Sequence, residues 1–224
     1  ATEAKTAALQ ELAVSSRYSD GLATGTGTDQ IAVAAMEDDG PPLTSAGKHA
    51  KLGELIGRAV CEAIKGALAR QNNLTPASQC SAKIHLERFG LSRAGMQEKI
   101  CNYLESDQAE LLRCNFTTVE RDPMTVAAVA ALVHLRDKMT WGVLPKTCQS
   151  EVMGSFAAQI ACSVSGHYAR MEEYRRLLAP TRRETGNAVF IDLACRALAL
   201  GFAEKWRNIP SSSLFKPCNN TFGG

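Results

Sequence analysis

The sequence predicts an α/β unit over residues 1–75, followed by a mostly α-helical region over residues 76–210. Three observations lead to this fold class. A helical pattern opens the chain, a short run of small apolar and β-branched residues follows at residues 30–36, and a long helical pattern comes after it. Beyond residue 75, capping residues and prolines separate further helical patterns. The order predicted for the first unit is therefore helix, strand and long helix.

The first helical pattern, "ATEAKTAALQELAV", places apolar residues on one face, and these are Ala4, Ala8, Leu9 and Leu12. A run rich in glycine and threonine, "GLATGTGTD", follows it. Phosphate- and dinucleotide-binding loops pass from a strand into a helix, whereas an apolar run follows these glycines. No Lys-Ser or Lys-Thr follows Gly27, and no third glycine completes the dinucleotide pattern. We interpret the run as a tight bend at the edge of a strand.

The strand is predicted over Gln30–Met36, where small apolar and β-branched residues predominate. Acidic residues, a glycine and two prolines occupy residues 37–42, a composition typical of a turn. The sequence therefore predicts a short buried strand that ends in this turn.

The long helix is predicted within "SAGKHAKLGELIGRAVCEAIKGALARQ", with Ser45 as its N-cap. Its apolar stripe consists of Leu52, Ile56, Ala59, Val60, Ala63 and Ala67. His49, Gly53 and Gly57 lie four residues apart and form a row beside this stripe. Because a glycine inside a helix costs about 1 kcal/mol relative to alanine, we expect a neighbouring element or a ligand close to this row.

The second half of the chain reads as a series of helices. A helix is predicted from Pro76 to Phe89, and others begin after Ser92 and after Ser106. Asp122 followed by Pro123 predicts the capped start of a largely apolar helix. Two more are predicted near residues 147–178 and 185–207, and residues 211–224 are expected to form a disordered tail.

Composition excludes several classes of function. Apolar residues make up 45% of the 224 residues and charged residues 21%, with a net charge of +2, as in ordinary globular proteins. The densest basic stretch, residues 170–183, also contains Glu172 and Glu173, which indicates a solvated helix face. The longest strongly apolar run, residues 124–135, is far shorter than the roughly 20 residues needed to cross a bilayer. We expect neither a nucleic-acid nor a membrane partner.

The eight cysteines include no Cys-x-x-Cys pair and none at zinc-ligand spacing from a histidine, so we expect no metal site. Several lie in apolar helical patterns, where a thiol is usually a small buried group. Reduced thiols and a cytoplasmic location are the favoured interpretation. The even number of cysteines and three Asn-x-Thr triplets leave a secreted, disulfide-bonded domain as an alternative.

Three motifs, "TEAKTAALQEL", "ATGTGTDQIAVA" and "GKHAKLGELIGRAV", follow one another with short gaps over residues 2–60. Together they resemble the adenosylcobinamide amidohydrolase family of corrinoid salvage. The resemblance implies hydrolysis of the amide joining adenosylcobyric acid to aminopropanol in adenosylcobinamide or a related corrinoid. It also implies an α/β core, of which this chain holds the C-terminal part. The cobalt corrinoid is the substrate, and neither a cofactor nor a metal ion is expected.

Amide hydrolysis needs a nucleophile, a base, donors for the oxyanion and an acid for the leaving amine. The candidate catalytic residues at the motif positions are Thr26, Thr28, Asp29 and His49. The candidate substrate-binding residues are Glu3, Gly25, Gly27, Lys48, Lys51 and Gly53. A non-catalytic module that binds a corrinoid or a phosphate is the alternative. Convergence of Asp29 and His49 in one cleft would favour catalysis. The sequence leaves open whether the chain forms a homo-oligomer.

Overall fold

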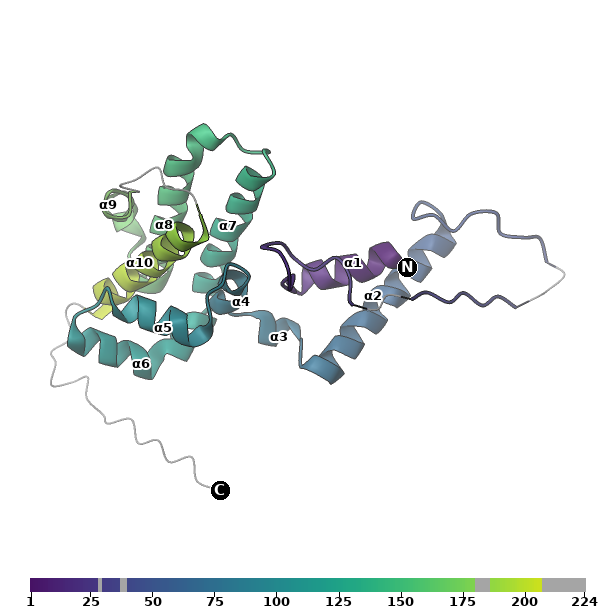
Figure 1. The fold of residues 1–224 in the computed structure, drawn as a ribbon, viewed down its shortest axis with the longest axis horizontal. Helices are drawn as coiled ribbons and strands as arrows, with labels where there is room; N and C mark the ends of the chain where they lie inside the picture. The colour runs from purple at the N-terminus through teal and green to yellow at the C-terminus, as the bar shows by residue number, and fades with distance from the viewer. Residues whose placement is uncertain (28–29, 37–39, 180–185, 207–224) are drawn as a thin grey trace, which may run out of the picture. The chain divides into compact units, whose positions relative to one another are not determined.

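A computed structural model describes residues 1–27, 30–36, 40–179 and 186–206 of the chain. The chain divides into two compact units, Ala1–Gln79 (unit 1) and Cys80–Gly224 (unit 2). In the part of the chain that the structure describes, every named element is a helix (Figure 1). The predicted α/β fold class is therefore wrong for this structure, which is helical.

The predicted strand at residues 30–36 does not form. These residues adopt no regular structure and are exposed, with Ile31 59% and Val33 89% accessible to solvent. Among the described residues, the one β pairing is an isolated antiparallel bridge between Ser15 and Leu22. A strand is stable only when another strand accepts and donates its backbone hydrogen bonds, and no described segment does so here.

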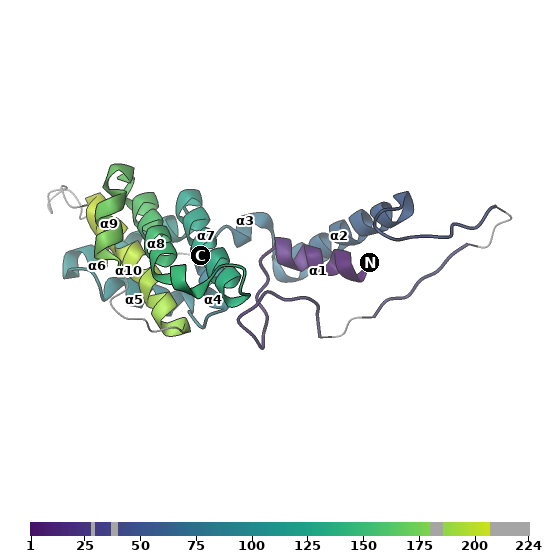
Figure 2. The same cartoon turned by 90° about the horizontal axis from the view of Figure 1, so that it is seen from above.

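Unit 1 is built from α1 (Thr2–Glu11), which packs against α2 (Lys51–Asn72), as Figures 1 and 2 both show. Ala8, Leu9 and Leu12 are buried, as the apolar face of the first helical pattern predicts. The Glu11 carboxylate accepts a hydrogen bond from Lys65 on α2, and this bond raises the pKa of the lysine. The short helix α3 (Pro76–Gln79) follows α2.

The start of α2 differs from the prediction. The helix begins at Lys51 with Ala50 as its N-cap, and no side chain caps it, so Ser45 is not the cap. Ala50 N donates to Gly47 O at 2.8 Å, which closes a turn just before the helix. His49 therefore lies in this turn and is not part of a row within the helix.

Unit 2 consists of α4 to α10 with two short 3-10 segments. The helices are α4 (Ala82–Glu87), α5 (Arg93–Cys101), α6 (Ser106–Arg121), α7 (Pro123–Thr140), α8 (Gln149–Ser165), α9 (Met171–Leu177) and α10 (Asn187–Trp206). The 3-10 segments are Lys146–Cys148 and Tyr168–Arg170. Helix α8 packs against α7, α9 and α10, and Figure 2 shows these helices grouped together.

One hydrophobic core holds unit 2 together, with Leu132, Ile160 and Leu198 among its fully buried side chains. Helices α8 and α10 approach closely at Gly201. A Cβ atom at this position would lie 2.6 Å from Ala161 O and 2.8 Å from Val164 Cβ. The absence of a side chain on Gly201 therefore permits this approach.

The predicted helical second half is confirmed, with two interruptions. The segment Pro76–Phe89 forms two short helices, and the segment 147–178 is broken at Gly166, whose φ of +79° ends α8. The cap of α7 is confirmed, because Asp122 Oδ2 accepts a hydrogen bond from Thr125 N at 2.8 Å. The expected tail at residues 211–224 lies outside the described residues.

Candidate functional site

The polar face of α1 holds the Gly/Thr-rich run against it. Lys5 Nζ donates to Thr26 Oγ1 at 2.8 Å, and Thr6 Oγ1 donates to the Thr24 carbonyl at 2.7 Å. One helical turn further on, Gln10 Nε2 donates to the Ala23 carbonyl at 3.1 Å. Partner numbers fall as the α1 numbers rise, so the run lies antiparallel to the helix.

A tight reversal after α1 makes these contacts possible. Ala13 adopts a left-handed conformation with φ of 50°, which turns the chain at the end of the helix. Ala23 N then donates to Val14 O at 2.7 Å, and Ser16 N donates to Gly21 O at 2.9 Å. These bonds return the chain along α1. The start of the second sequence motif, residues 23–26, therefore lies beside the first motif.

The glycines of this run leave its backbone accessible. Gly25 is half-buried and Gly27 is exposed, and a Cβ atom added at Gly27 would meet nothing within 4 Å. Packing therefore does not require a glycine at Gly27. Two candidate catalytic residues, Thr28 and Asp29, lie outside the described residues.

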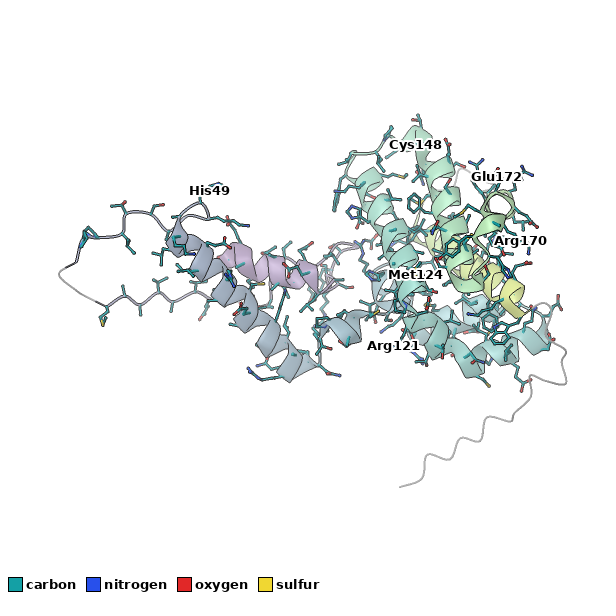
Figure 3. All side chains as sticks on the ribbon, turned by 180° about the vertical axis from the view of Figure 1, so that it is seen from behind. His49, Arg121, Met124, Cys148, Arg170 and Glu172 are labelled. Atoms are coloured by element: carbon teal, nitrogen blue, oxygen red, sulfur yellow. The ribbon has the colours of Figure 1, made fainter. Side chains whose placement is uncertain are left out.

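A second group of candidates lies at the start of α2. Figure 3 shows His49 at the turn that leads into this helix, and the side chains of Lys48, His49 and Lys51 are all exposed. Exposed cations near a helix N-terminus are open to an anionic group, which the helix dipole also attracts. The segment that links this group to the Gly/Thr-rich run is exposed at each of its described residues from 30 to 46.

Gly53 has a structural reason to be glycine. A Cβ atom at Gly53 would clash with the backbone carbonyls of Ala46 and Gly47, because the turn before α2 folds back over the helix. The expectation that something approaches the glycine row is met at Gly53 by this turn. At Gly57 a Cβ atom would meet nothing within 4 Å. Close packing therefore explains only one of the two glycines.

The contact between Lys5 and Thr26 was missed by the sequence analysis. Glu3 is exposed on the first turn of α1, and Lys5 is half-buried beside the run. The sequence did contain one sign of this contact, because side chains that can donate hydrogen bonds recur along the helix at Lys5, Thr6 and Gln10. Nothing in the sequence shows that the chain reverses to bring acceptors to this face.

The basic stretch of unit 2 is paired with carboxylates. Arg170 makes two hydrogen bonds to Glu173, at 2.6 and 2.8 Å, and an ion pair with the buried Glu204. Arg175 bonds to Glu172, and Figure 3 labels Arg170 and Glu172 on this side of unit 2. These pairs agree with the interpretation of the described part of this stretch as a solvated, mixed-charge surface.

Cysteine pairing departs in one place from the expected reduced state. Cys114 is disulfide-bonded. The free thiols among the described residues belong to Cys61, Cys80, Cys101, Cys148, Cys162 and Cys195. Burial raises the pKa of the Cys195 thiol to about 12, so this side chain is a buried apolar group and a poor nucleophile.

His, Cys, Asp and Glu side chains nowhere form a group of three or more that could hold a metal ion within the described ranges. No helix in the described part of the chain is both long and apolar enough to span a bilayer.

Comparison with known proteins finds a family match at the start of the chain. Residues 1–76 match the sequence model of the adenosylcobinamide amidohydrolase family, CbiZ. The resemblance inferred from the three motifs is therefore confirmed over this segment, which is associated with an amidohydrolase family.

A particular relative comes from Methanocaldococcus jannaschii. This uncharacterized protein is 43% identical to the chain over 74 residues, which are 33% of this chain and 28% of the relative. The aligned segment thus spans less than a third of that protein. No solved structure matches the chain significantly.

Proposed function

We propose that residues 1–76 contribute to an adenosylcobinamide amidohydrolase that serves cobalamin salvage. The enzyme hydrolyses the amide between adenosylcobyric acid and aminopropanol in adenosylcobinamide or a related corrinoid. The observation that carries the proposal is the family match over this segment. The hydrogen bonds from α1 to the Gly/Thr-rich run support it, because they hold the start of the second motif against the first. The cobalt corrinoid is the substrate, and the proposal places the reaction in the cytoplasm.

The reaction adds one water across the amide. The water oxygen attacks the carbonyl carbon, the C–N bond breaks, and the leaving amine takes a proton. His49 acts as the base that accepts the proton of the water. The hydroxyls of Thr26 and Thr28 lie close to the reacting carbonyl. Asp29 orients the water or the histidine. The backbone N–H groups of Gly25 and Gly27 donate to the oxyanion.

The remaining candidates bind the substrate. Lys48 and Lys51 hold an anionic or carbonyl-bearing side chain of the corrinoid, and Glu3 accepts from its amide side chains. The turn that approaches Gly53 places Lys48 beside the first turn of α2.

Lys5 enters the proposal as a positioning residue. Its ammonium donates to Thr26 Oγ1 and so fixes the position of the threonine oxygen. A fixed hydroxyl needs no reorientation when the substrate binds, which favours the reaction. Exchange of Lys5 for methionine removes the donor while keeping a flexible apolar stem. We expect this variant to lower kcat more than it changes KM.

The experiment that tests the proposal is a chromatographic assay for adenosylcobyric acid. Adenosylcobinamide is incubated with the 224-residue chain, alone and co-expressed with the part of the M. jannaschii relative outside the aligned residues. We expect product from the pair, and loss of product with Thr26→Ala. The matched control is Thr118→Ala, because Thr118 is also an exposed threonine but lies in unit 2.

Two results would count against the proposal in different ways. Corrinoid binding without product would favour the alternative, a non-catalytic module that binds a corrinoid or a phosphate. Equal product from the wild type and Thr26→Ala would leave the reaction in place and remove Thr26 from it.

A further inference from the structure

Two consecutive carbonyl groups of the Gly/Thr-rich run are turned toward α1. Gln10 Nε2 donates to Ala23 O at 3.1 Å, and Thr6 Oγ1 donates to Thr24 O at 2.7 Å. The Thr6 hydroxyl also lies 3.2 Å from Thr2 O, but its single proton serves the shorter bond. Because Thr6 and Gln10 are four residues apart, they lie on the same face of α1. Both carbonyl oxygens therefore point to one side of the run.

The planar peptide bond fixes where the neighbouring N–H groups point. In a trans peptide unit, the carbonyl oxygen of one residue and the N–H of the next lie on opposite sides of the C–N bond. The described residues include no cis peptide bond. The N–H of Thr24 lies opposite Ala23 O, and the N–H of Gly25 lies opposite Thr24 O. Both N–H groups therefore point away from α1.

A bend in the run places these two N–H groups on the same side. In an extended strand, consecutive carbonyl groups point to opposite sides, whereas here the chain bends at Thr24 and Gly25. Among the described residues, neither N–H group donates to an acceptor. Thr24 is exposed, and Gly25 has no side chain that could shield the pair. Within the described part of the chain, a ligand therefore has access to both donors.

Two backbone N–H groups on one side of a chain suit an oxygen that carries negative charge. Such donors stabilise an oxyanion most when they are already held in place before the charge develops. The bonds from Thr6 and Gln10 hold them, because rotation of either peptide unit would break one of these bonds. The bond from Lys5 to Thr26 Oγ1 fixes the residue that follows.

We propose that the N–H groups of Thr24 and Gly25 form an anion-binding donor pair, with Thr6 and Gln10 as its positioning residues. In the amide hydrolysis, the carbonyl oxygen gains an electron pair when water attacks and returns it when the C–N bond breaks. The pair binds this oxyanion and then the carboxylate of the product. The inference rests on the proposed function, to which it adds Thr24 as a donor and two residues that act through the backbone.

The first test is the steady-state kinetics of Thr6→Val, in the chain co-expressed with the same part of the M. jannaschii relative. Valine keeps the shape of threonine but has no hydroxyl. We expect kcat to fall roughly tenfold to hundredfold and KM to change by less than about twofold, because the bond matters when the oxyanion forms. Thr6→Ser keeps the donor and should restore kcat. Gln10→Leu should lower kcat less, because its bond is longer.

Two matched controls remove similar hydrogen bonds in unit 2. Thr140→Val removes a hydroxyl that donates to Arg136 O at 3.0 Å, and Gln97→Leu removes an amide that donates to Arg113 O at 3.4 Å. Both should leave kcat unchanged. Equal kcat in the wild type and Thr6→Val, or an equal fall in Thr140→Val, would overturn the proposal.

The second test observes the two donors directly and does not depend on turnover. The chain is labelled with ¹⁵N-threonine and ¹⁵N-glycine, and saturating adenosylcobyric acid is added to the complex. We expect the amide proton signals of Thr24 and Gly25 to shift downfield, because the carboxylate accepts from both, and Thr6→Val to lose this shift.

The two readouts separate the donor pair from the reaction. A complex that shows both shifts but releases no adenosylcobyric acid would contradict the proposed reaction and leave the donor pair standing. A complex that releases the product but shows neither shift would overturn the donor pair and leave the reaction standing.

Discussion

Unit 1 and unit 2 are both helical, but they differ in how much they bury. Among the described residues of unit 1, the buried hydrophobic side chains are those of Ala8, Leu9 and Leu12. Unit 2 has a continuous core drawn from α4 to α10. Unit 1 nevertheless holds the family match and every candidate site residue. In this chain the family match and the continuous hydrophobic core therefore lie in different regions.

The two units differ in burial because their helices cover one another's apolar faces to different extents. Helix α8 contacts α7, α9 and α10 and buries apolar side chains between them. In unit 1, α1 covers one side of α2 and the Gly/Thr-rich run covers the polar face of α1. A side chain that is half exposed contributes only part of its transfer free energy. Stability should therefore depend on unit 2 and activity on unit 1.

The largest expected effect is on turnover, from His49→Ala. If His49 is the base, its loss should lower kcat roughly 100-fold to 10,000-fold in the complex that releases adenosylcobyric acid. The melting temperature should not change, because the side chain is exposed. His134→Ala removes an exposed histidine of unit 2 and serves as the control. Unchanged kcat in His49→Ala would show that His49 is not the base.

The second effect compares two leucines by urea unfolding followed by circular dichroism. Leu132 on α7 is fully buried, so Leu132→Ala should lower the free energy of unfolding by about 2–5 kcal/mol. Leu55→Ala on α2 should change it by less than about 0.5 kcal/mol. A large loss in Leu55→Ala would show that this side chain is already covered and would break the contrast between the units.

The third effect compares alanine substitutions at two glycines, which we expect to change the stability of the chain in opposite directions. Gly201→Ala forces α8 and α10 apart and should destabilise the chain by about 1–3 kcal/mol. Gly57→Ala adds a methyl group where nothing lies within 4 Å, so it should stabilise α2 by about 0.5–1 kcal/mol. Thermal unfolding of both variants measures the difference. Destabilisation by Gly57→Ala would indicate an element or ligand close to that position.

The smallest effect is a pH dependence confined to unit 2. Burial, together with the hydrogen bond that Tyr103 donates to Asp192, raises the pKa of Tyr103 to about 12. The unfolded-state pKa is about 10, so the stabilisation is complete below that pH and is lost as pH rises toward 12. Melting temperatures between these pH values should fall less steeply in Tyr103→Phe. Tyr168→Phe, also exposed, is the control, and identical slopes in all three proteins would contradict the prediction.

Features that depend on neighbouring residues were predicted better than features that depend on distant ones. The cap at Asp122 and the helical pattern of α1 were predicted correctly, because both depend on bonds between residues three or four positions apart. The break at Gly166 was missed, although glycine is the usual residue at such a helix end. The strand at residues 30–36 was wrong, because a strand requires a partner and none lies within the described residues.

The candidate site divides in the same way. The three motifs pointed to the family that residues 1–76 match, since short motifs in a fixed order carry that information without a fold. The placement of His49 in a turn and the approach of Ala46 and Gly47 to Gly53 came only from the coordinates. Asp29, on which the predicted convergence depends, lies outside the described residues, so its role stays a prediction.

By itself, the sequence determined where most helices lie and which family the first 76 residues resemble. Both properties depend on the spacing of neighbouring residues. Helices follow from this spacing because their hydrogen bonds join residues four positions apart. Tertiary structure alone decided that Lys5 meets Thr26, 21 residues away, and that Leu55 and Ile56 of α2 are left exposed. Such contacts depend on a chain reversal and on which surfaces find partners, and neither is encoded at any single position.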